Sequence, residues 1–372
     1  MLKALACFIV AIWCVASLNA QTDVFGISKL YPSKQGFAEW TSAHWNNGVD
    51  RTITYASDAY DPTNWTEDHS GSSYGFHIDG KGVMTMYGTP RFHVNPKISS
   101  KVSAQVFTNI EFTAYYKKTG SQGASYGGMI VGMRGAANGH GSSNGNNCDA
   151  QCYMGRFRND GKWDFEKELK HPATTYYSGS GYMKQDPLWG GKKLPEDKWI
   201  GMKYILINVN NTVKMTLYID TVSNGNPVNG GVWQLVGEVI DNGSNFQGAD
   251  ISGCSYSDKY MPITAGGNVF WRTDNDTAQY KMVSIREIDP VANELIEVTG
   301  NKEKFSLRFS STEINILSEA QIFKVEIIDA AGRMVLSDSS NNNIFDISNL
   351  ATGVYLLRAT TSDGVLVKRF VH

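Results

Sequence analysis

The centre of the chain, from Cys152 to His171, alternates between apolar and polar residues on both sides of a short turn. The turn sequence is Asn159-Asp160-Gly161, and these residue types tolerate the positive φ angles that tight turns need. On the second arm Trp163, Phe165 and Leu169 share one phase, and Asp164, Glu166 and Glu168 share the other. Successive side chains of a strand point to opposite faces. The pattern therefore predicts a β-hairpin with one face packed on a core and one polar face.

On the first arm the polar phase adds Arg156 and Arg158 to the three acids. A face with both signs of charge suits a polar ligand, and it equally suits an ordinary solvated surface. Lys167 breaks the pattern, because it falls in the apolar phase of the second arm. The alternation leaves this one residue unexplained.

Other segments alternate in the same way between turn-forming residues. Ile110, Phe112, Ala114 and Tyr116 share one phase, opposite to Glu111, Thr113, Tyr115 and Lys117. Further strands are predicted at 83–87, 127–134, 199–208, 213–220, 231–240, 268–273 and 279–288. The 37 glycines and the aromatic share of 12% agree with many turns around a β core. The sequence therefore predicts an all-β fold built as an antiparallel sandwich.

Residues 21–290 resemble, in strand pattern and composition, the concanavalin A-like jelly-roll group of lectins, glucanases and polysaccharide lyases. The resemblance implies an antiparallel jelly-roll β-sandwich that engages carbohydrate. It contains no signature motif for one particular reaction.

The first twenty residues have the features of an export signal. Lys3 gives a positive start, and the apolar run from Leu5 to Ala16 is too short to span a bilayer. Cleavage is expected after Ala20, which leaves Gln21 as the first mature residue. No later segment is apolar enough to cross a membrane, so no transmembrane segment is predicted.

Three cysteines remain after this signal: Cys148, Cys152 and Cys254. An odd number in an exported protein predicts one disulfide and one free thiol. All three pairings stay open. A metal site formed by the three is disfavoured, because their spacing is not a paired CxxC and no histidine stands at zinc-ligand spacing.

The end of the chain carries three blocks in a fixed order: IFKVEIIDAAGRMV at 322–335, FDISNLATGVYLLR at 345–358 and VLVKRFVH at 365–372. Gly332 suits a turn between two strands, and Gly353 lets Tyr355 enter the next strand. The blocks resemble the type A C-terminal sorting domain of type IX secretion cargo. The resemblance implies a small Ig-like β-sandwich at 305–372 after a polar linker at 291–304. It also implies export by the type IX secretion machinery, with release or attachment at the cell surface. A plain Ig-like stalk is the alternative.

The acid ladder is one candidate for chemistry. Side chains two apart on a strand lie about 6.6–6.8 Å apart along its axis, and glycosidases need two carboxylates at about 5–9 Å. Glucanases of the resembling superfamily use an acid-x-acid-x-acid strand that opens with Glu and has Asp in the middle. This chain has Asp164, Glu166 and Glu168 instead. The alternative is the solvated face of a hairpin.

A second candidate is β-elimination on a uronate-containing polysaccharide. Lyases neutralise the uronate carboxylate with Arg, Gln or Asn and remove the neighbouring proton with Tyr or His. The candidate catalytic residues are Arg134, His140, Tyr153, Arg156 and His171. The two arginines suit a bidentate grip on a carboxylate. His140 lies in a Gly/Asn/Ser-rich stretch, whereas His171 equally suits a hydrogen bond at a strand end.

Binding without chemistry is the third candidate and the one we favour. Aromatic faces pack against the apolar C–H face of a pyranose ring. The residues predicted to contact carbohydrate are Glu111, Tyr115, Arg158, Glu166 and Trp189. Tyr176, Tyr177 and Tyr182 share the loop of Trp189, and Trp40, Trp45 and Trp65 lie in another region. Scattered aromatics of this kind are more often core residues.

Two oxygen-rich clusters make structural calcium a candidate. Asp274 and Asp276 flank Asn275, and Asp58 stands near Asp61. Ordinary Asp/Asn turns are the alternative. The net charge of −2 provides no basic field for nucleic acid. We therefore expect a secreted or outer-membrane-surface protein whose partners are a polysaccharide and the secretion machinery.

Overall fold

The structure is a computed structural model that describes residues 22–53, 58–63, 65–70, 74–95, 106–120, 123–135, 147–176, 189, 192–290, 305–309, 312–318, 320–329, 333–339, 342–351, 353–362 and 364–372. The expected export signal, the linker at 291–304, His140, Tyr177, Tyr182 and Gly332 lie outside these residues. The chain divides into a main unit, Thr22–Asn293, and a second unit that contains Glu294–His372.

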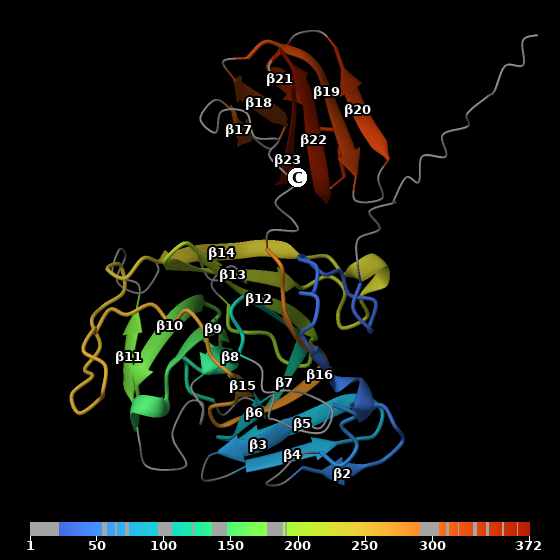
Figure 1. Ribbon diagram of the computed structural model, residues 1–372. Coiled ribbons are helices and arrows are strands. Elements are labelled where there is room, and N and C mark those ends of the chain that lie inside the picture. The colour runs from blue at the N-terminus through green and yellow to red at the C-terminus, as the bar shows by residue number, and fades with distance from the viewer. Residues whose placement is uncertain are drawn as a thin grey trace, which may run out of the picture. The chain divides into compact units, whose positions relative to one another are not determined.

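The main unit consists of two antiparallel sheets, whose strands are labelled in Figure 1. The nine-stranded sheet has the order β14 (Gln234–Asp241), β13 (Thr212–Asp220), β12 (Ile200–Val209), β7 (Ile110–Gly120), β16 (Asp276–Glu287), β5 (Val83–Gly88), β4 (Tyr74–Ile78) and β2 (Arg51–Thr52), with β1 (Trp40–Thr41) paired to β16. The seven-stranded sheet has the order β11 (Ala173–Tyr176), β10 (Trp163–Lys170), β9 (Cys152–Arg158), β8 (Gly128–Gly135), β15 (Asn268–Arg272), β6 (Arg91–Asn95) and β3 (Thr66–Ser70). The 3-10 helices of the described residues are η1 (Ser42–Trp45), η2 (Asn147–Asp149) and η3 (Val228–Gly230).

One apolar core fills the space between the two sheets. The ring of Phe165 on the seven-stranded sheet stacks on Tyr204 of the nine-stranded sheet at 5.8 Å between centroids. Trp271 likewise meets Phe112 across the sheets at 5.8 Å. The tryptophans Trp40, Trp45 and Trp65 belong to this core and are fully buried. The expectation of an all-β sandwich is therefore confirmed, and these three rings are core residues that do not face a ligand.

The central hairpin forms as the alternation predicts. Strands β9 and β10 pair antiparallel with Met154 opposite Glu166. Gly161 occupies the turn with φ 83°, and a Cβ there would lie 1.9 Å from the Lys192 carbonyl oxygen, so the turn requires glycine. Phe165 faces the core, and Glu166 faces the other side of the sheet. Period-two patterning thus correctly assigns both faces.

The second unit has a core of its own. A three-stranded sheet contains β17 (Phe305–Phe309), β18 (Glu313–Ser318) and β21 (Ile344–Asp346). A four-stranded sheet contains β20 (Met334–Asp338), β19 (Ile322–Asp329), β22 (Val354–Thr361) and β23 (Gly364–Val371). Ile316, Val325, Phe345 and Leu357 from both sheets pack in one buried cluster. The unit is therefore a small β-sandwich.

The cysteines of the main unit pair in one of the three open ways. A disulfide joins Cys148 to Cys254, with 5.6 Å between their Cα atoms. Cys152 is a free thiol, buried on β9. The described part of the chain contains no helix with the length and apolarity that a membrane crossing requires.

Candidate functional site

The polar face, as we use the term, is the side of the seven-stranded sheet that points away from the core. Strand pairing places residues of five strands on it in register: Arg91 and His93 of β6, Asn268 and Arg272 of β15, Arg156 and Arg158 of β9, Asp164, Glu166 and Glu168 of β10, and Tyr176 of β11. Polar and charged side chains thus lie on both sides of β8, which itself brings Ile130 to this face, and a small apolar cluster of Ile130, Cys152, Met154 and Phe270 separates them.

Arg156 stands at the centre of this face between two carboxylates. Its Nε lies 2.5 Å from Asp164 Oδ1, and its Nη2 lies 2.6 Å from Glu166 Oε1. Arg158 reaches the same Asp164 at 2.8 Å and also pairs with Asp160 at 2.7 Å. The two arginines expected to grip or contact a ligand on this strand, Arg156 and Arg158, are thus engaged by acids of the neighbouring strand and turn.

Burial and neighbouring charges shift the pKa of the Glu166 carboxyl group. Desolvation raises the pKa of its carboxyl group, the neighbouring Asp164 carboxylate acts in the same direction, and Arg156 and a hydrogen bond with Tyr176 oppose them. Cys152 lies opposite Glu168 across the strand pair, and burial raises the pKa of its thiol. The centre of the face is therefore a buried network of paired charges in which the pKa of Glu166 is raised.

The four candidate catalytic residues that the structure describes do not form one site. Arg134 and Tyr153 meet at the backbone of Ile263, whereas Arg156 pairs with Asp164. Tyr153 faces the core between the sheets, where its hydroxyl donates to Asp241 Oδ2 at 2.5 Å, whereas Arg156 is on the opposite side of the same strand. Arg134 is fully buried and donates to the backbone carbonyls of Ile263, at 2.8 Å, and Thr108. Burial lowers the pKa of Arg134 to about 10.

His171 pairs with Glu168 at 2.7 Å, which matches the alternative of a hydrogen-bonding residue at a strand end. His140 lies outside the described residues. Arg134, Tyr153 and Arg156 therefore do not converge on one uronate. Tyr153 and Arg156 lie on opposite faces of β9, because they occupy odd and even positions of that strand. The guanidinium group of Arg134 is taken up by backbone carbonyls.

Two of the expected carbohydrate contacts, Glu111 and Tyr115, lie on the outer face of the nine-stranded sheet. Glu111 is buried and pairs with Lys203 at 3.0 Å and Arg286 at 2.5 Å. Arg286 also donates to the carbonyl of Tyr31, at 2.5 Å. These contacts fix the N-terminal segment of the main unit against the sheet. The Tyr115 hydroxyl donates to Asp220 at 2.7 Å, so neither side chain offers its polar atoms to a ligand.

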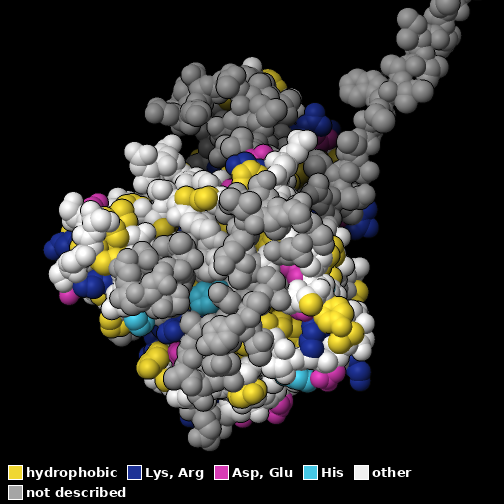
Figure 2. Space-filling view, turned by 60° about the horizontal axis from the view of Figure 1, so that its bottom comes forward, with side chains coloured by type: hydrophobic (Ala, Val, Ile, Leu, Met, Phe, Trp, Pro, Cys, Tyr) yellow, Lys and Arg dark blue, Asp and Glu magenta, His cyan; other side chains and the backbone are white. Residues whose placement is uncertain are grey.

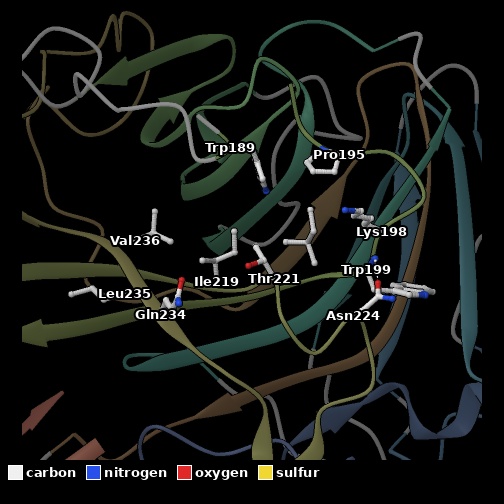
Figure 3. A pocket seen from close by; sticks show the side chains of 11 residues that line it. Trp189, Pro195, Lys198, Trp199, Ile219, Thr221, Asn224, Gln234, Leu235 and Val236 are labelled. Carbon is white, nitrogen blue, oxygen red and sulfur yellow. Dashed lines mark hydrogen bonds between the residues drawn. The ribbon is translucent and has the colours of Figure 1, made fainter. Parts of the chain in front are cut away.

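Trp189 lines a pocket of about 580 Å³ at the ends of β12, β13 and β14. Figure 3 shows its indole directed toward the strand ends, opposite Ile219 and Thr221. The lining side chains are Trp189, Pro195, Lys198, Trp199, Ile200, Ile219, Thr221, Asn224, Gln234, Leu235 and Val236. Lys198, Thr221, Gln234 and Leu235 are exposed, so the pocket opens to solvent.

The acids proposed for calcium have protein partners. Asp58 accepts from Arg51 Nε at 3.0 Å, Asp61 accepts from the backbone N–H of Thr63 at 2.7 Å, and Asp276 accepts from Asn159 at 2.9 Å. Among the described residues no group of three or more His, Cys, Asp or Glu side chains is placed to hold a metal ion. In the view of Figure 2 the described cationic and anionic side chains are interspersed, and no patch of one sign dominates that face.

Sequence reasoning missed part of both regions. Arg91 and His93 alternate with Phe92 and Val94, which is the same period-two signal that revealed the hairpin. Asn224 and Gln234 of the pocket carry no such signal, because they come from a turn and a strand start that only tertiary packing brings beside Trp189.

The geometry defines an all-β protein with a main sandwich and a small C-terminal sandwich. Residues 309–372 match the family described as the secretion system C-terminal sorting domain. The C-terminal unit is thus a sorting domain, as its three sequence blocks predict, and it implies secretion or a cell-surface location. No curated protein matches the chain in sequence.

Solved structures similar to this chain include a glycosyl hydrolase candidate and lectins. A candidate glycosyl hydrolase from Parabacteroides distasonis is 14% identical, with 59% of this chain and 86% of that chain covered and a TM-score of 0.31. Arcelin-5, a lectin-like defence protein from Phaseolus vulgaris, is 9% identical, with 68% and 95% covered and a TM-score of 0.27. Lectin II from Ulex europaeus is 7% identical, with 64% and 98% covered and a TM-score of 0.30. At these TM-scores the resemblance carries no argument about function.

Proposed function

We propose that the main unit is a non-catalytic carbohydrate-binding module of an exported protein, and that it takes a sugar in the pocket at Trp189. The observation that carries the proposal is the composition of this pocket. An indole face, aliphatic side chains and uncharged polar groups line the same space. A pyranose has an apolar C–H face and a rim of hydroxyl groups, so it complements such a lining.

The polar groups of the pocket have hydrogen-bonding capacity to spare. The side chains of Thr221 and Gln234 have no partner among the described residues, and both are exposed. Asn224 Oδ1 accepts from the Trp199 N–H at 3.1 Å. That contact uses the carbonyl oxygen of the amide and leaves its NH₂ group as a donor. The volume of about 580 Å³ lies in the range of about 300–1,000 Å³ that is typical of small-molecule sites.

The same lining favours binding over catalysis. Of its described residues, Lys198 is the only one with a charged side chain. Glycoside cleavage needs a pair of proton-transferring groups, and no second group of that kind lines this pocket within the described residues. The pocket therefore holds a sugar without a means to break its bonds.

The test is affinity electrophoresis of the full chain through gels that contain single soluble polysaccharides, preceded by a glycan array. We expect retention on at least one neutral glycan. Trp189→Ala and Gln234→Ala each weaken it about tenfold, which is about 1.4 kcal/mol. Tyr87→Ala removes an exposed ring of β5 and serves as the matched control, with unchanged retention. A wild-type chain that no glycan retains, or a Trp189→Ala variant retained like the wild type, refutes the proposal.

A second candidate function rests on the polar face. Asp164 and Glu166 share Arg156, and burial raises the pKa of the Glu166 carboxyl group, so two carboxyl groups in different environments stand side by side. Such a pair is what glycoside hydrolysis uses. The binding proposal takes precedence, because both carboxyl groups are buried whereas the pocket is open. New reducing ends from a glucan, abolished in Glu166→Gln and retained in Glu196→Gln, would establish hydrolysis instead.

A further inference from the structure

Two lysines lie against one tryptophan on the outer face of the nine-stranded sheet. Lys281 Nζ lies 4.4 Å from the centroid of the Trp199 ring, and Lys117 Nζ lies 4.9 Å from it. Lys281 pairs with Tyr115 across the strands, and Lys117 is two residues beyond Tyr115 on β7. Both side chains therefore emerge on the same face of the sheet.

Neither lysine has an acidic partner among the described residues. Each ammonium group lies against the indole ring and makes no hydrogen bond or ion pair with a described residue. Of the acids carried by neighbouring segments, Glu196 pairs with Lys118 at 3.8 Å and Asp220 accepts from Tyr115 at 2.7 Å, while Asp197 is exposed in the segment before β12. Two like charges thus share one ring without a counter-ion.

The cost of this arrangement is visible in Lys281. Burial lowers the pKa of its ammonium group, and the neighbouring charge of Lys117 lowers it further. A cation–π contact contributes about 0.5–1 kcal/mol at exposed sites, and an anion between the two ammonium groups would add attraction to both.

The indole between the lysines is held in place from the other side. Gly225, at φ 71°, packs so closely that a Cβ there would lie 2.7 Å from Trp199 Cγ and from Lys281 Cε. The backbone N–H of Trp199 donates to Asn224 Oδ1 at 3.1 Å, which ties this turn to the start of the tryptophan segment. The turn thus packs against the ring and Lys281, and Lys117 lies against the same ring.

We propose that Lys117 and Lys281 together bind one carboxylate or sulfate group of an acidic polysaccharide. Lysine is a compact point charge that suits a multi-oxygen anion, and two such charges converge here. The site is distinct from the pocket at Trp189, because the Trp199 ring points away from that pocket, as Figure 3 shows. Trp199 nevertheless belongs to the pocket lining. That the anion belongs to a polysaccharide rests on the proposed function, since this residue connects the lysines to a site assigned to a sugar.

The experiment measures retention of the full chain by polygalacturonate, dextran sulfate and uncharged dextran at several salt concentrations. We expect the wild type to be retained by at least one acidic polymer, increasingly at low salt. Lys117→Gln/Lys281→Gln weakens that retention about tenfold and leaves any retention on dextran unchanged. The charge-conserving variant Lys117→Arg/Lys281→Arg keeps the retention on the acidic polymer. The matched control Lys192→Gln/Lys193→Gln removes the same charge from two exposed lysines and has little effect.

The possible outcomes either overturn the anion site or identify its ligand. No retention of the wild type on either acidic polymer, or an equal loss in the control pair, overturns the anion site. Retention on polygalacturonate alone or dextran sulfate alone assigns the carboxylate or the sulfate. Competition by inorganic phosphate at millimolar concentration would show that a free anion suffices and would overturn the polysaccharide assignment. Failure of the proposed sugar pocket is told apart from failure of the anion site by a different variant. It appears as unchanged retention of Trp189→Ala on a neutral glycan.

Discussion

The ammonium group of Lys167 lies 2.7 Å from the Asp241 carboxylate, and both side chains are fully buried between the two sheets. The Tyr153 hydroxyl donates to the same carboxylate oxygen at 2.5 Å, and Lys167 also donates to the carbonyl of Tyr260 at 2.8 Å. Asp241 ends β14 of the nine-stranded sheet, whereas Lys167 belongs to β10 of the seven-stranded sheet. The ion pair therefore connects the two sheets and explains why a lysine stands in an apolar phase.

Loss of one partner of this pair should be costly. Lys167→Met leaves the Asp241 carboxylate buried without a cation, and we expect the free energy of unfolding to fall by about 3–5 kcal/mol. Lys170→Met on the same strand is the control, because Lys170 is half-buried and donates only to Ser252. Urea unfolding followed by tryptophan fluorescence measures both. Adding Asp241→Asn to Lys167→Met should recover part of the loss, and a single variant no worse than the control would contradict the role of the pair.

The raised pKa of Glu166 predicts a pH dependence of stability with a definite sign. Burial and Asp164 raise the pKa of this carboxyl group, so the folded state binds the proton more tightly than the unfolded state. The stabilisation is complete below the unfolded pKa of about 4.3 and is lost as the pH rises through the folded value. Relative to Glu166→Gln, the wild type should therefore lose stability as the pH rises above about 4.

Glu111 provides a comparison, because its pKa shifts in the opposite direction to that of Glu166. Burial opposes ionisation of its carboxyl group, but Lys203 and Arg286 outweigh burial and lower its pKa. Its contribution is present above the unfolded pKa and is lost as the pH falls through the folded value. Unfolding free energies of wild type, Glu166→Gln and Glu111→Gln from about pH 2 to about pH 8 measure both trends, because the Glu111 change falls below the unfolded pKa of about 4.3. Difference curves that slope in the same direction for the two variants would refute the assignment.

The alternation of residues predicted the faces of the hairpin because it depends only on neighbours in the sequence. It placed Glu166 and Phe165 on opposite sides, as the structure has them. It did not show what covers a face. Glu111 therefore resembled a ligand contact, although Arg286 and the segment around Tyr31 bury it. The partner of Lys167 is 74 residues away, and no local pattern specifies such a pair.

In the candidate sites too, local sequence pattern predicts the face on which a residue lies but not its distant neighbours. Odd and even spacing alone would have separated Tyr153 from Arg156, and the lyase hypothesis overlooked that signal. Trp189 was identified from its residue type, and it does line a pocket. Its neighbours Asn224 and Gln234 could not be found in this way, because turns far apart in sequence meet only through the packing of the sheets.

The disulfide predicts that substitutions at Cys254 and at Cys152 change the free energy of unfolding by different amounts. Cys148 and Cys254 are 106 residues apart, and a crosslink over about 100 residues contributes about 4–5 kcal/mol by restricting the unfolded chain. Cys254→Ser should therefore lower the unfolding free energy by several times more than Cys152→Ala, which removes only a free thiol. Peptide mapping under non-reducing conditions should show a Cys148–Cys254 peptide. Alkylation of Cys152 before denaturation would contradict its burial.

Removal of residues 309–372 should separate delivery from binding. The two units have separate buried cores, so the truncated chain keeps every core contact of the main unit. Because the deleted part is the sorting domain, we expect the shortened protein to remain inside the producing cell, while its purified form unfolds at the temperature of the main-unit transition of the full chain. Cell fractionation and calorimetry of both proteins measure this.

The matched control is Leu357→Ala, which removes a fully buried side chain from the core of the sorting domain and should cost about 2–5 kcal/mol in that unit alone. Equal export of the truncated and full chains would remove the sorting role, and a main unit that melts earlier after truncation would show that the two cores depend on each other.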